Sequence, residues 1–151
     1  MPATPWAKFS LPSEGALACG HSPEFVKSLR EVFGPLVERV EAFPSGAHPW
    51  LMREVPAEGS LSALVRDLEK RLTPSGALWL VFPKKPFVAE FGFPFFWNDV
   101  QKAGLAAGLV DNKVAAFSPR LTSIRFVVPL SRRKGHAATW LLWILATRPL
   151  C

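Results

Sequence analysis

The sequence contains no tyrosine, only two cysteines and no long apolar run, and each absence argues against a class of protein. Cys19 and Cys151 lie near opposite ends and belong to no Cys-x-x-Cys or Cys/His spacing, which argues against a zinc or other metal site. No stretch reaches the roughly 18 uninterrupted apolar residues of a membrane span, and the proline-rich start at residues 1–15 is a poor secretory signal. We therefore expect a cytoplasmic protein with no metal site and no membrane span.

The chain is basic, because 18 lysines and arginines outnumber 12 aspartates and glutamates and give a formal net charge of +6. Such an excess favours encounters with polyanions, including nucleic acids. However, the basic residues are spread along the sequence, and only Arg132, Arg133 and Lys134 form a dense cluster. This distribution is more typical of a solvated surface than of a nucleic-acid interface, so we do not expect nucleic-acid binding.

The first half of the chain predicts a strand, a helix and two further strands. Residues 15–19 form an apolar run of strand length, and Ser22 suits the N-cap of a helix whose apolar residues recur at helical spacing. A second strand is expected over residues 37–43. A third is expected within residues 48–55, beginning only after Pro49, because proline has no backbone N–H for a strand ladder.

The second half continues the alternation of helix and strand. Ser60 opens a helix whose apolar stripe runs to Leu72, and the turn residues 73–76 are expected to end it. Residues 77–82 form a continuous apolar run, as expected for a central strand that helices cover on both faces. A further helix is predicted over residues 96–107.

Two short strands, 110–117 and 121–128, complete the pattern, and the three-residue link between them permits only antiparallel pairing. The alternation predicts a three-layer α/β fold, with a mostly parallel sheet, helices on both faces and a terminal antiparallel hairpin. We expect an irregular lead-in at residues 1–14, a single α/β domain at 15–130, and a basic then apolar tail at 131–151 packed on the body or on a partner.

This layout resembles a shortened form of the S-adenosylmethionine-dependent methyltransferase fold. A closer resemblance is to a family of small bacterial proteins of unknown function. The segments that carry it are GALWLVFPKK at residues 76–85 and, after one helix, AGLAAGLVDNKVAAFSPRLTSIRFVV at residues 103–128. The resemblance implies a truncated methyltransferase-like, or Rossmann-like, architecture, and because that family has no assigned activity it implies no chemistry.

Ligands of parallel α/β sheets collect at the carboxyl ends of the strands. This rule selects Gly20, His21 and Ser22 after the first strand, Arg53 and Glu54 after the third, and Lys84 and Lys85 after the central strand. Backbone amides at the start of the first helix, together with the two lysines, could hold a phosphate or carboxylate, which predicts a site for a nucleotide or another anion. The competing interpretation is an ordinary helix N-cap and two solvated lysines.

The methyltransferase resemblance implies an acidic residue and a glycine-rich turn after the first strand, and an acid at the end of the second strand. Here the first turn reads ACGHSP, with one glycine and no acid, while Glu38 and Glu41 lie near the second strand without marking its end. We therefore expect no cofactor, with S-adenosylmethionine as the alternative. No catalytic residue is assigned, because no Ser/His/Asp motif surrounds His21, the one histidine expected at this edge.

Aromatic residues are concentrated in the loop from Phe87 to Trp97 and in the tail. So much apolar area is expected to be buried over the sheet edge or at a subunit interface, which predicts a homo-oligomer as one option. We also expect a surface ion pair between Asp111 and Lys113, and a salt bridge of Arg125 with Asp111 as a candidate partner.

The favoured function is a catalytically degenerate methyltransferase-like binding or interaction domain, not an enzyme. The alternative is a small enzyme or binding protein for a nucleotide or other anion at the carboxyl edge.

Overall fold

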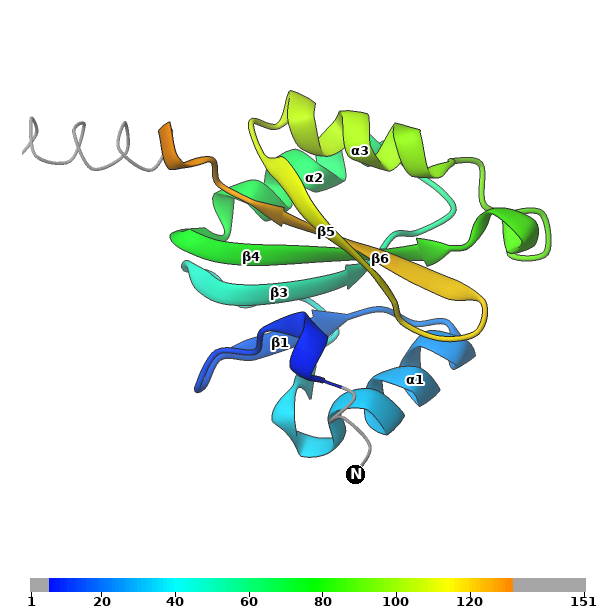
Figure 1. Ribbon diagram of the computed structural model, residues 1–151, viewed down its shortest axis with the longest axis horizontal. Coiled ribbons are helices and arrows are strands. Elements are labelled where there is room, and N and C mark those ends of the chain that lie inside the picture. The colour runs from blue at the N-terminus through cyan, green and yellow to red at the C-terminus, as the bar shows by residue number, and fades with distance from the viewer. Residues whose placement is uncertain (1–5, 132–151) are drawn as a thin grey trace, which may run out of the picture.

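The structure is a computed structural model that describes residues 6–131, and one six-stranded sheet forms its centre (Figure 1). The strands are β1 (Ala16–Cys19), β2 (Glu38–Arg39), β3 (His48–Glu54), β4 (Leu72–Pro83), β5 (Val110–Ala116) and β6 (Leu121–Val127). Their order is β2-β1-β3-β4-β6-β5. The first four strands pair in parallel, whereas β6 runs antiparallel to both β4 and β5. The predicted mostly parallel sheet with a terminal antiparallel hairpin is confirmed.

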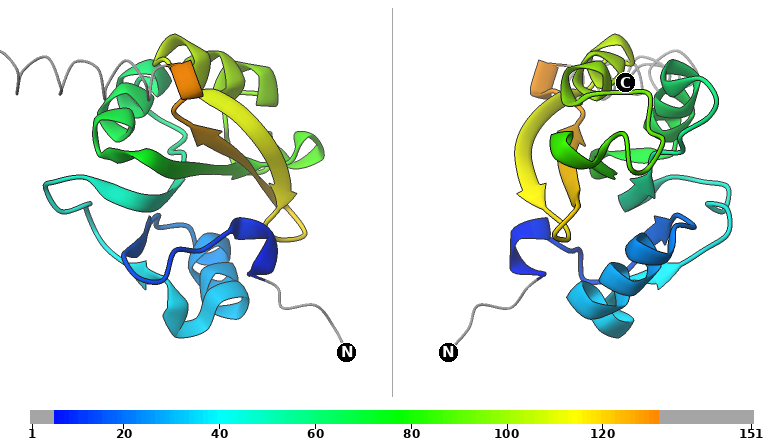
Figure 2. Two further views of the ribbon diagram at one scale, coloured as in Figure 1. Left: turned by 60° about the vertical axis from the view of Figure 1, so that its left-hand side comes forward. Right: turned by 90° about the vertical axis from the view of Figure 1, so that its right-hand side faces the viewer.

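Helices cover both faces of the sheet. The views in Figures 1 and 2 place α1 (Pro23–Phe33) on one face, and α2 (Leu61–Lys70) and α3 (Trp97–Ala106) together on the other. Ser22 and Ser60 cap α1 and α2 as predicted, since each hydroxyl oxygen accepts a backbone N–H three residues on at 3.1 Å. Within residues 6–131, no helix is long and apolar enough to cross a membrane.

The two faces of β4 support two separate hydrophobic cores. Leu78, Leu80 and Phe82 point into the core under α2 and α3, whereas Trp79 and Val81 point into the core on the α1 side. All five side chains are buried, because successive residues of a strand face opposite sides and helices or loops cover both. This explains why the strand is an uninterrupted apolar run in the sequence.

Three predicted boundaries are wrong. The strand expected over residues 37–43 is only two residues long. Strand β3 begins before Pro49, not after it, because a register shift between His48 and Trp50 lets the ladder pass the proline. Helix α2 ends at Lys70, and residues 73–76 belong to β4 rather than to a turn, because β4 extends back to pair with the start of β3.

The lead-in is held by Phe9. Its ring is fully buried and lies edge-on to Trp79, with centroids 4.8 Å apart, and its carbonyl oxygen accepts the indole N–H of Trp50 at 2.9 Å. Trp6, the other aromatic residue of this segment, has a side chain that is 37% exposed. The predicted tail at residues 131–151 lies, apart from its first residue, outside the described residues.

Helix α3 approaches β6 closely at Gly104, so a substitution of Gly104 tests this packing contact. A Cβ atom at this position would lie 2.1 Å from a ring carbon of the fully buried Phe126. We expect Gly104→Ala to lower the free energy of unfolding by about 1–3 kcal/mol in chemical denaturation, because overpacking outweighs the better helix propensity of alanine, about 1 kcal/mol.

Leu105→Ala is the matched control, because Leu105 is exposed on the same helix and its truncation should change stability little. Adding Phe126→Leu to Gly104→Ala should make the combined loss smaller than the sum of the two single losses. A Gly104→Ala protein as stable as the wild type would contradict this account of the α3–β6 contact.

Candidate functional site

The turn after β1 is closed by Glu54, the last residue of β3. One carboxylate oxygen of Glu54 accepts the backbone N–H groups of His21 and Ser22, each at 3.0 Å, and the other accepts the hydroxyl of Ser22. These two amides lie at the N-terminal end of α1, where the sequence predicts an anion site. A carboxylate from the chain itself therefore holds the position in which a ligand anion would bind.

Gly20 is needed for the packing of this turn. A Cβ atom on Gly20 would lie 2.5 Å from a ring carbon of Phe25 and 2.6 Å from the Cβ of Glu54. Both distances are shorter than real Cβ contacts allow. In glycine-rich cofactor turns the missing side chain lets the ligand approach the backbone. Here the same space holds two side chains of the protein.

Arginine, not an acid, marks the end of β2. Arg39 donates from Nε to the carbonyl of Gly20 at 3.0 Å and lies 3.3 Å from Nδ1 of His21. Glu41 then lies 3.5 Å from Arg39 and 3.6 Å from His21, with its own side chain 77% exposed. These contacts tie His21 to β2 at the surface. They do not give it a buried carboxylate partner of the kind that orients a catalytic histidine.

The predicted ligand residues line two different hollows. His21 and Ser22 border a cavity of about 210 Å³. Arg53 and Glu54 also line it, as do Phe91 and Phe93 of the loop Phe87–Trp97, called the Phe-rich loop below. Lys84 and Lys85 border a cavity of about 640 Å³ between the end of β4 and the start of α3. Pro83 is the residue that the two linings share. The structure thus separates His21 and Ser22 from Lys84 and Lys85, and Gly20 lines neither cavity. Of the two cavities, only the larger reaches the volume usual for small-molecule sites, about 300–1,000 Å³.

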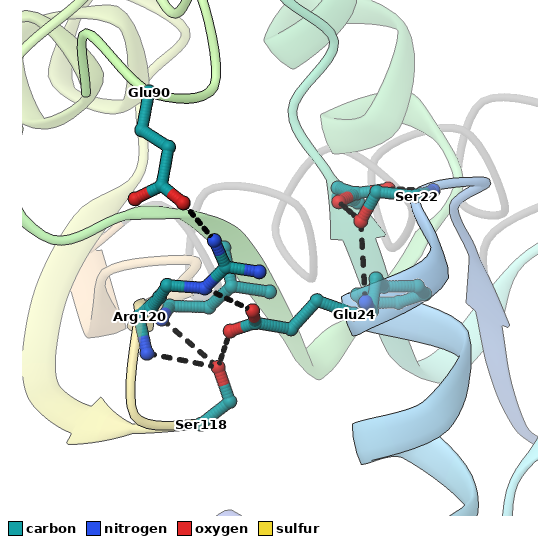
Figure 3. A network of polar contacts seen from close by, with 8 residues as sticks. Ser22, Glu24, Glu90, Ser118 and Arg120 are labelled. Carbon is teal, nitrogen blue, oxygen red and sulfur yellow. Dashed lines mark hydrogen bonds and ion pairs between the residues drawn. The ribbon is translucent and has the colours of Figure 1, made fainter. Parts of the chain in front are cut away.

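A polar network joins the hairpin turn to α1 across the carboxyl edge (Figure 3). Glu24, in the first turn of α1, accepts from the guanidinium of Arg120 and from the hydroxyl of Ser118. Arg120 also pairs with Glu90 and lies over the ring of Phe91, 4.9 Å from its centroid. One arginine therefore connects α1, the β5–β6 turn and the Phe-rich loop.

Ionisation of Glu24 is coupled to these contacts. Burial acts to raise the pKa of Glu24, whose side chain is only 15% exposed, but the hydrogen bonds from Ser118 and Arg120 and the charge of Arg120 together lower that pKa below its ordinary value of 4.5. The hydrogen bond to Glu24 correspondingly raises the pKa of Arg120. The carboxylate form of Glu24 is therefore the one that the fold stabilises.

The Phe-rich loop folds back on the sheet edge. Phe93 is buried and stacks on Phe82 with centroids 6.3 Å apart, while Phe91 and Phe95 pack against the core. Phe96 and Trp97 remain 49% and 41% exposed, beside the larger cavity. The expectation of burial over the sheet edge is met for Phe93, is met in part for Phe91 and Phe95, and fails for Phe96 and Trp97.

Sequence reasoning missed the two residues that organise this edge. The sequence places Glu54 only at the end of the third strand, and Arg120 only in the link between the last two strands. An acid at the end of a strand next to the first turn is a signal that could have identified Glu54. No comparable signal exists for Arg120, because its partner Glu24 is 96 residues away.

The predicted polar pairs on the hairpin are wrong. Asp111 accepts from the amide of Gln101 at 3.3 and 3.4 Å, and Lys113 donates to the carbonyl of Lys8 at 2.7 Å. Among the ion pairs formed by residues 6–131, none joins Arg125 to an acid, and its Nε is buried with no hydrogen-bond partner in this part of the chain. Asp111 therefore binds α3 and Lys113 binds the lead-in, instead of each other.

No protein-family model matches the chain, and no curated protein is similar to it in sequence. Its fold, however, is similar to those of solved methyltransferases. The O-methyltransferase NcsB1 from neocarzinostatin biosynthesis, solved with S-adenosylmethionine and a naphthoic acid, has a TM-score of 0.59 at 12% identity, over 82% of this chain and 51% of that one. CalO1, a methyltransferase in calicheamicin biosynthesis, has a TM-score of 0.57 at 13% identity, over 80% and 50%.

A third similar structure is the magnesium protoporphyrin IX methyltransferase ChlM from Synechocystis PCC 6803, solved with bound S-adenosylmethionine, with a TM-score of 0.55 at 14% identity over 83% of this chain and 74% of that one. The chain has a methyltransferase-like fold. It spans about half the length of the first two enzymes. At these identities the likeness extends to the fold alone, and membership of the bacterial family of unknown function stays a prediction.

The Glu24–Arg120 contact predicts a specific pH dependence of stability. Because the folded-state pKa of Glu24 lies below its ordinary value of 4.5, its stabilising contribution is present above that pH and is lost as pH falls through the folded-state pKa. At neutral pH, Glu24→Gln should lower the free energy of unfolding in urea by about 1–3 kcal/mol, since charge-assisted hydrogen bonds are lost. The difference from wild type should shrink on acidification.

Glu31→Gln is the matched control, because Glu31 lies on the same helix and its exposed carboxylate is 3.9 Å from Lys27. This variant should follow the wild-type pH dependence, as exposed pairs contribute little. Parallel curves for Glu24→Gln and Glu31→Gln between neutral pH and about pH 3 would show that the Glu24 network is not linked to stability in the stated way.

Proposed function

We propose that this protein is a catalytically degenerate methyltransferase-like domain, which binds a ligand or partner and does not transfer a methyl group. The observation that carries the proposal is the position of Glu54. Its carboxylate accepts the amides of His21 and Ser22 at the turn that the fold uses for cofactor binding. A cofactor at this turn would have to displace an internal carboxylate that is held by three hydrogen bonds.

Two further features support a poor fit to S-adenosylmethionine. The space beside Gly20 is filled by Phe25 and Glu54, so the backbone offers no surface for close approach of a ligand. The hollow beside His21 and Ser22 measures about 210 Å³, which is small against the usual volume of ligand sites. We infer that the turn serves the packing of the fold, and we assign no chemical step to a bound cofactor.

The second candidate is a binding protein or small enzyme for a nucleotide or another anion at the carboxyl edge. A specific observation favours its binding part, namely the cavity of about 640 Å³ bordered by Lys84 and Lys85. Pro83 separates this cavity from the turn that Glu54 fills. Ligand binding in the cavity therefore does not require an open cofactor site at the turn. Both candidates place ligand binding at the carboxyl edge. They differ on whether a chemical reaction follows binding.

Calorimetric titration with S-adenosylmethionine and with S-adenosylhomocysteine tests the proposal. We expect no saturable heat and no rise in unfolding temperature with either compound. A ligand present at about 100 times its Kd would stabilise the native state by about 2.7 kcal/mol, so binding would be obvious. A solved methyltransferase of similar fold, titrated in parallel, serves as the positive control. Saturable binding of either compound to the wild-type protein would reject the proposal.

A homo-oligomer through the Phe87–Trp97 loop or the C-terminal tail stays a hypothesis. The loop route now depends mainly on Phe96 and Trp97, since Phe91, Phe93 and Phe95 pack on the core of the same chain. It predicts a mass above that of one chain in light scattering, and a single-chain mass for Phe96→Ser/Trp97→Ser. A wild-type protein with the mass of one chain would remove the hypothesis.

A further inference from the structure

The cavity between β4 and α3 has the form of a small-molecule site. Its volume is about 640 Å³, within the usual range of about 300–1,000 Å³ for such sites. The end of β4, the start of α3 and the first residues of β6 supply its walls, so secondary-structure elements as well as loop residues shape it. The site is therefore concave and largely preformed.

The walls are aromatic and apolar. Phe82 is 2% exposed and belongs to the core under α2 and α3, while Val88 is partly buried beside the same core. Phe96 and Trp97 are half-exposed at the cavity, although large aromatic rings are normally buried or covered. An apolar, flat body lying in the cavity would cover both rings.

The rim is cationic. Lys84 and Lys85 line the cavity, and its lining contains no aspartate or glutamate. Neither lysine takes part in an ion pair with the other residues of the described range 6–131. The backbone of Lys84 is held in place, since its N–H donates to the carbonyl of Arg120 at 2.9 Å and its carbonyl accepts from the N–H of Phe87 at 2.8 Å. Two ammonium groups carried by neighbouring residues of this segment complement an anionic group on a ligand.

Uncharged polar side chains complete the lining. Asn98 and Thr122 can each donate and accept a hydrogen bond, and they come from α3 and β6 respectively. Small-molecule sites typically combine apolar walls with a few polar groups that orient the ligand. The lining has this composition.

We propose that this cavity binds a small aromatic organic anion, with its rings against Phe96 and Trp97 and its carboxylate or phosphate group at Lys84 and Lys85. Aryl carboxylates and nucleoside monophosphates share this chemistry. The inference extends the proposed binding role and names its ligand class. It does not depend on the closure of the turn at Gly20, because only Pro83 is common to the two linings.

Two pairs of probes, matched in shape and different in charge, test the site by isothermal titration calorimetry. Biphenyl-4-carboxylate is compared with biphenyl-4-carboxamide, and adenosine monophosphate with adenosine. We expect the anion of at least one pair to bind about ten-fold or more tighter than its neutral partner, as a charge-assisted contact implies. The pair that shows the larger ratio identifies an aryl carboxylate or a nucleotide as the ligand type.

Variants locate the contact. Lys84→Gln/Lys85→Gln should reduce binding of the anion to that of its neutral partner and leave the neutral partner unchanged. Lys70→Gln/Lys102→Gln removes the same charge from exposed positions on α2 and α3 and should change little. Trp97→Leu should weaken both members of the pair, and thermal unfolding of every variant checks that the fold persists.

Three results would overturn the proposal. The first is equal affinity for the anion and its neutral partner in both pairs, and the second is an equal loss in the two double-lysine variants. The third is a combination of two observations: no probe binds, and Phe96→Ser/Trp97→Ser converts an oligomer to single chains. In that case a second copy of the chain, not a small ligand, covers the cavity. Binding of S-adenosylmethionine at the Gly20 turn would instead reject the proposed function and leave this site standing.

Discussion

The carboxylate of Glu54 is the contact on which the arrangement of the carboxyl edge depends. It joins the end of β3 to the backbone at the start of α1 and so fixes the first turn after β1. The contact is possible because Gly20 leaves room for the Cβ of Glu54 and for the ring of Phe25. An anion-binding element common to α/β folds is thereby satisfied inside the chain.

Arg120 extends this closure to the other half of the sheet. Its contacts with Glu24 and Glu90 join α1, the hairpin and the Phe-rich loop on the side where the first turn is already closed. The chain leaves its larger cavity on the opposite side of Pro83, where Lys84 and Lys85 have no such partners within residues 6–131. The edge that the fold generally uses for ligands is thus divided into a closed part and an open part.

This division gives the functional proposals their physical basis. Similar folds in NcsB1, CalO1 and ChlM belong to methyltransferases, yet identities of 12–14% extend the likeness to the fold alone. Function has to be inferred from the site, because one fold supports many activities. In this chain the turn is filled by its own residues, and the cavity beside it is bordered by two lysines that form no ion pair with residues 6–131.

The sequence by itself determined the elements and their order. The caps at Ser22 and Ser60, the doubly buried run at residues 77–82 and the short hairpin link are local signals, and they specified the α/β class and the final antiparallel pair. Tertiary structure decided the strand ends around Pro49 and Leu72, where pairing between β3 and β4 overrode local propensity. It also decided the site, because Glu54 reaches His21 across 33 residues and Arg120 reaches Glu24 across 96. Such contacts depend on which strands become neighbours. An acid at a strand end marks Glu54 as a candidate, but only the strand order shows which turn it reaches.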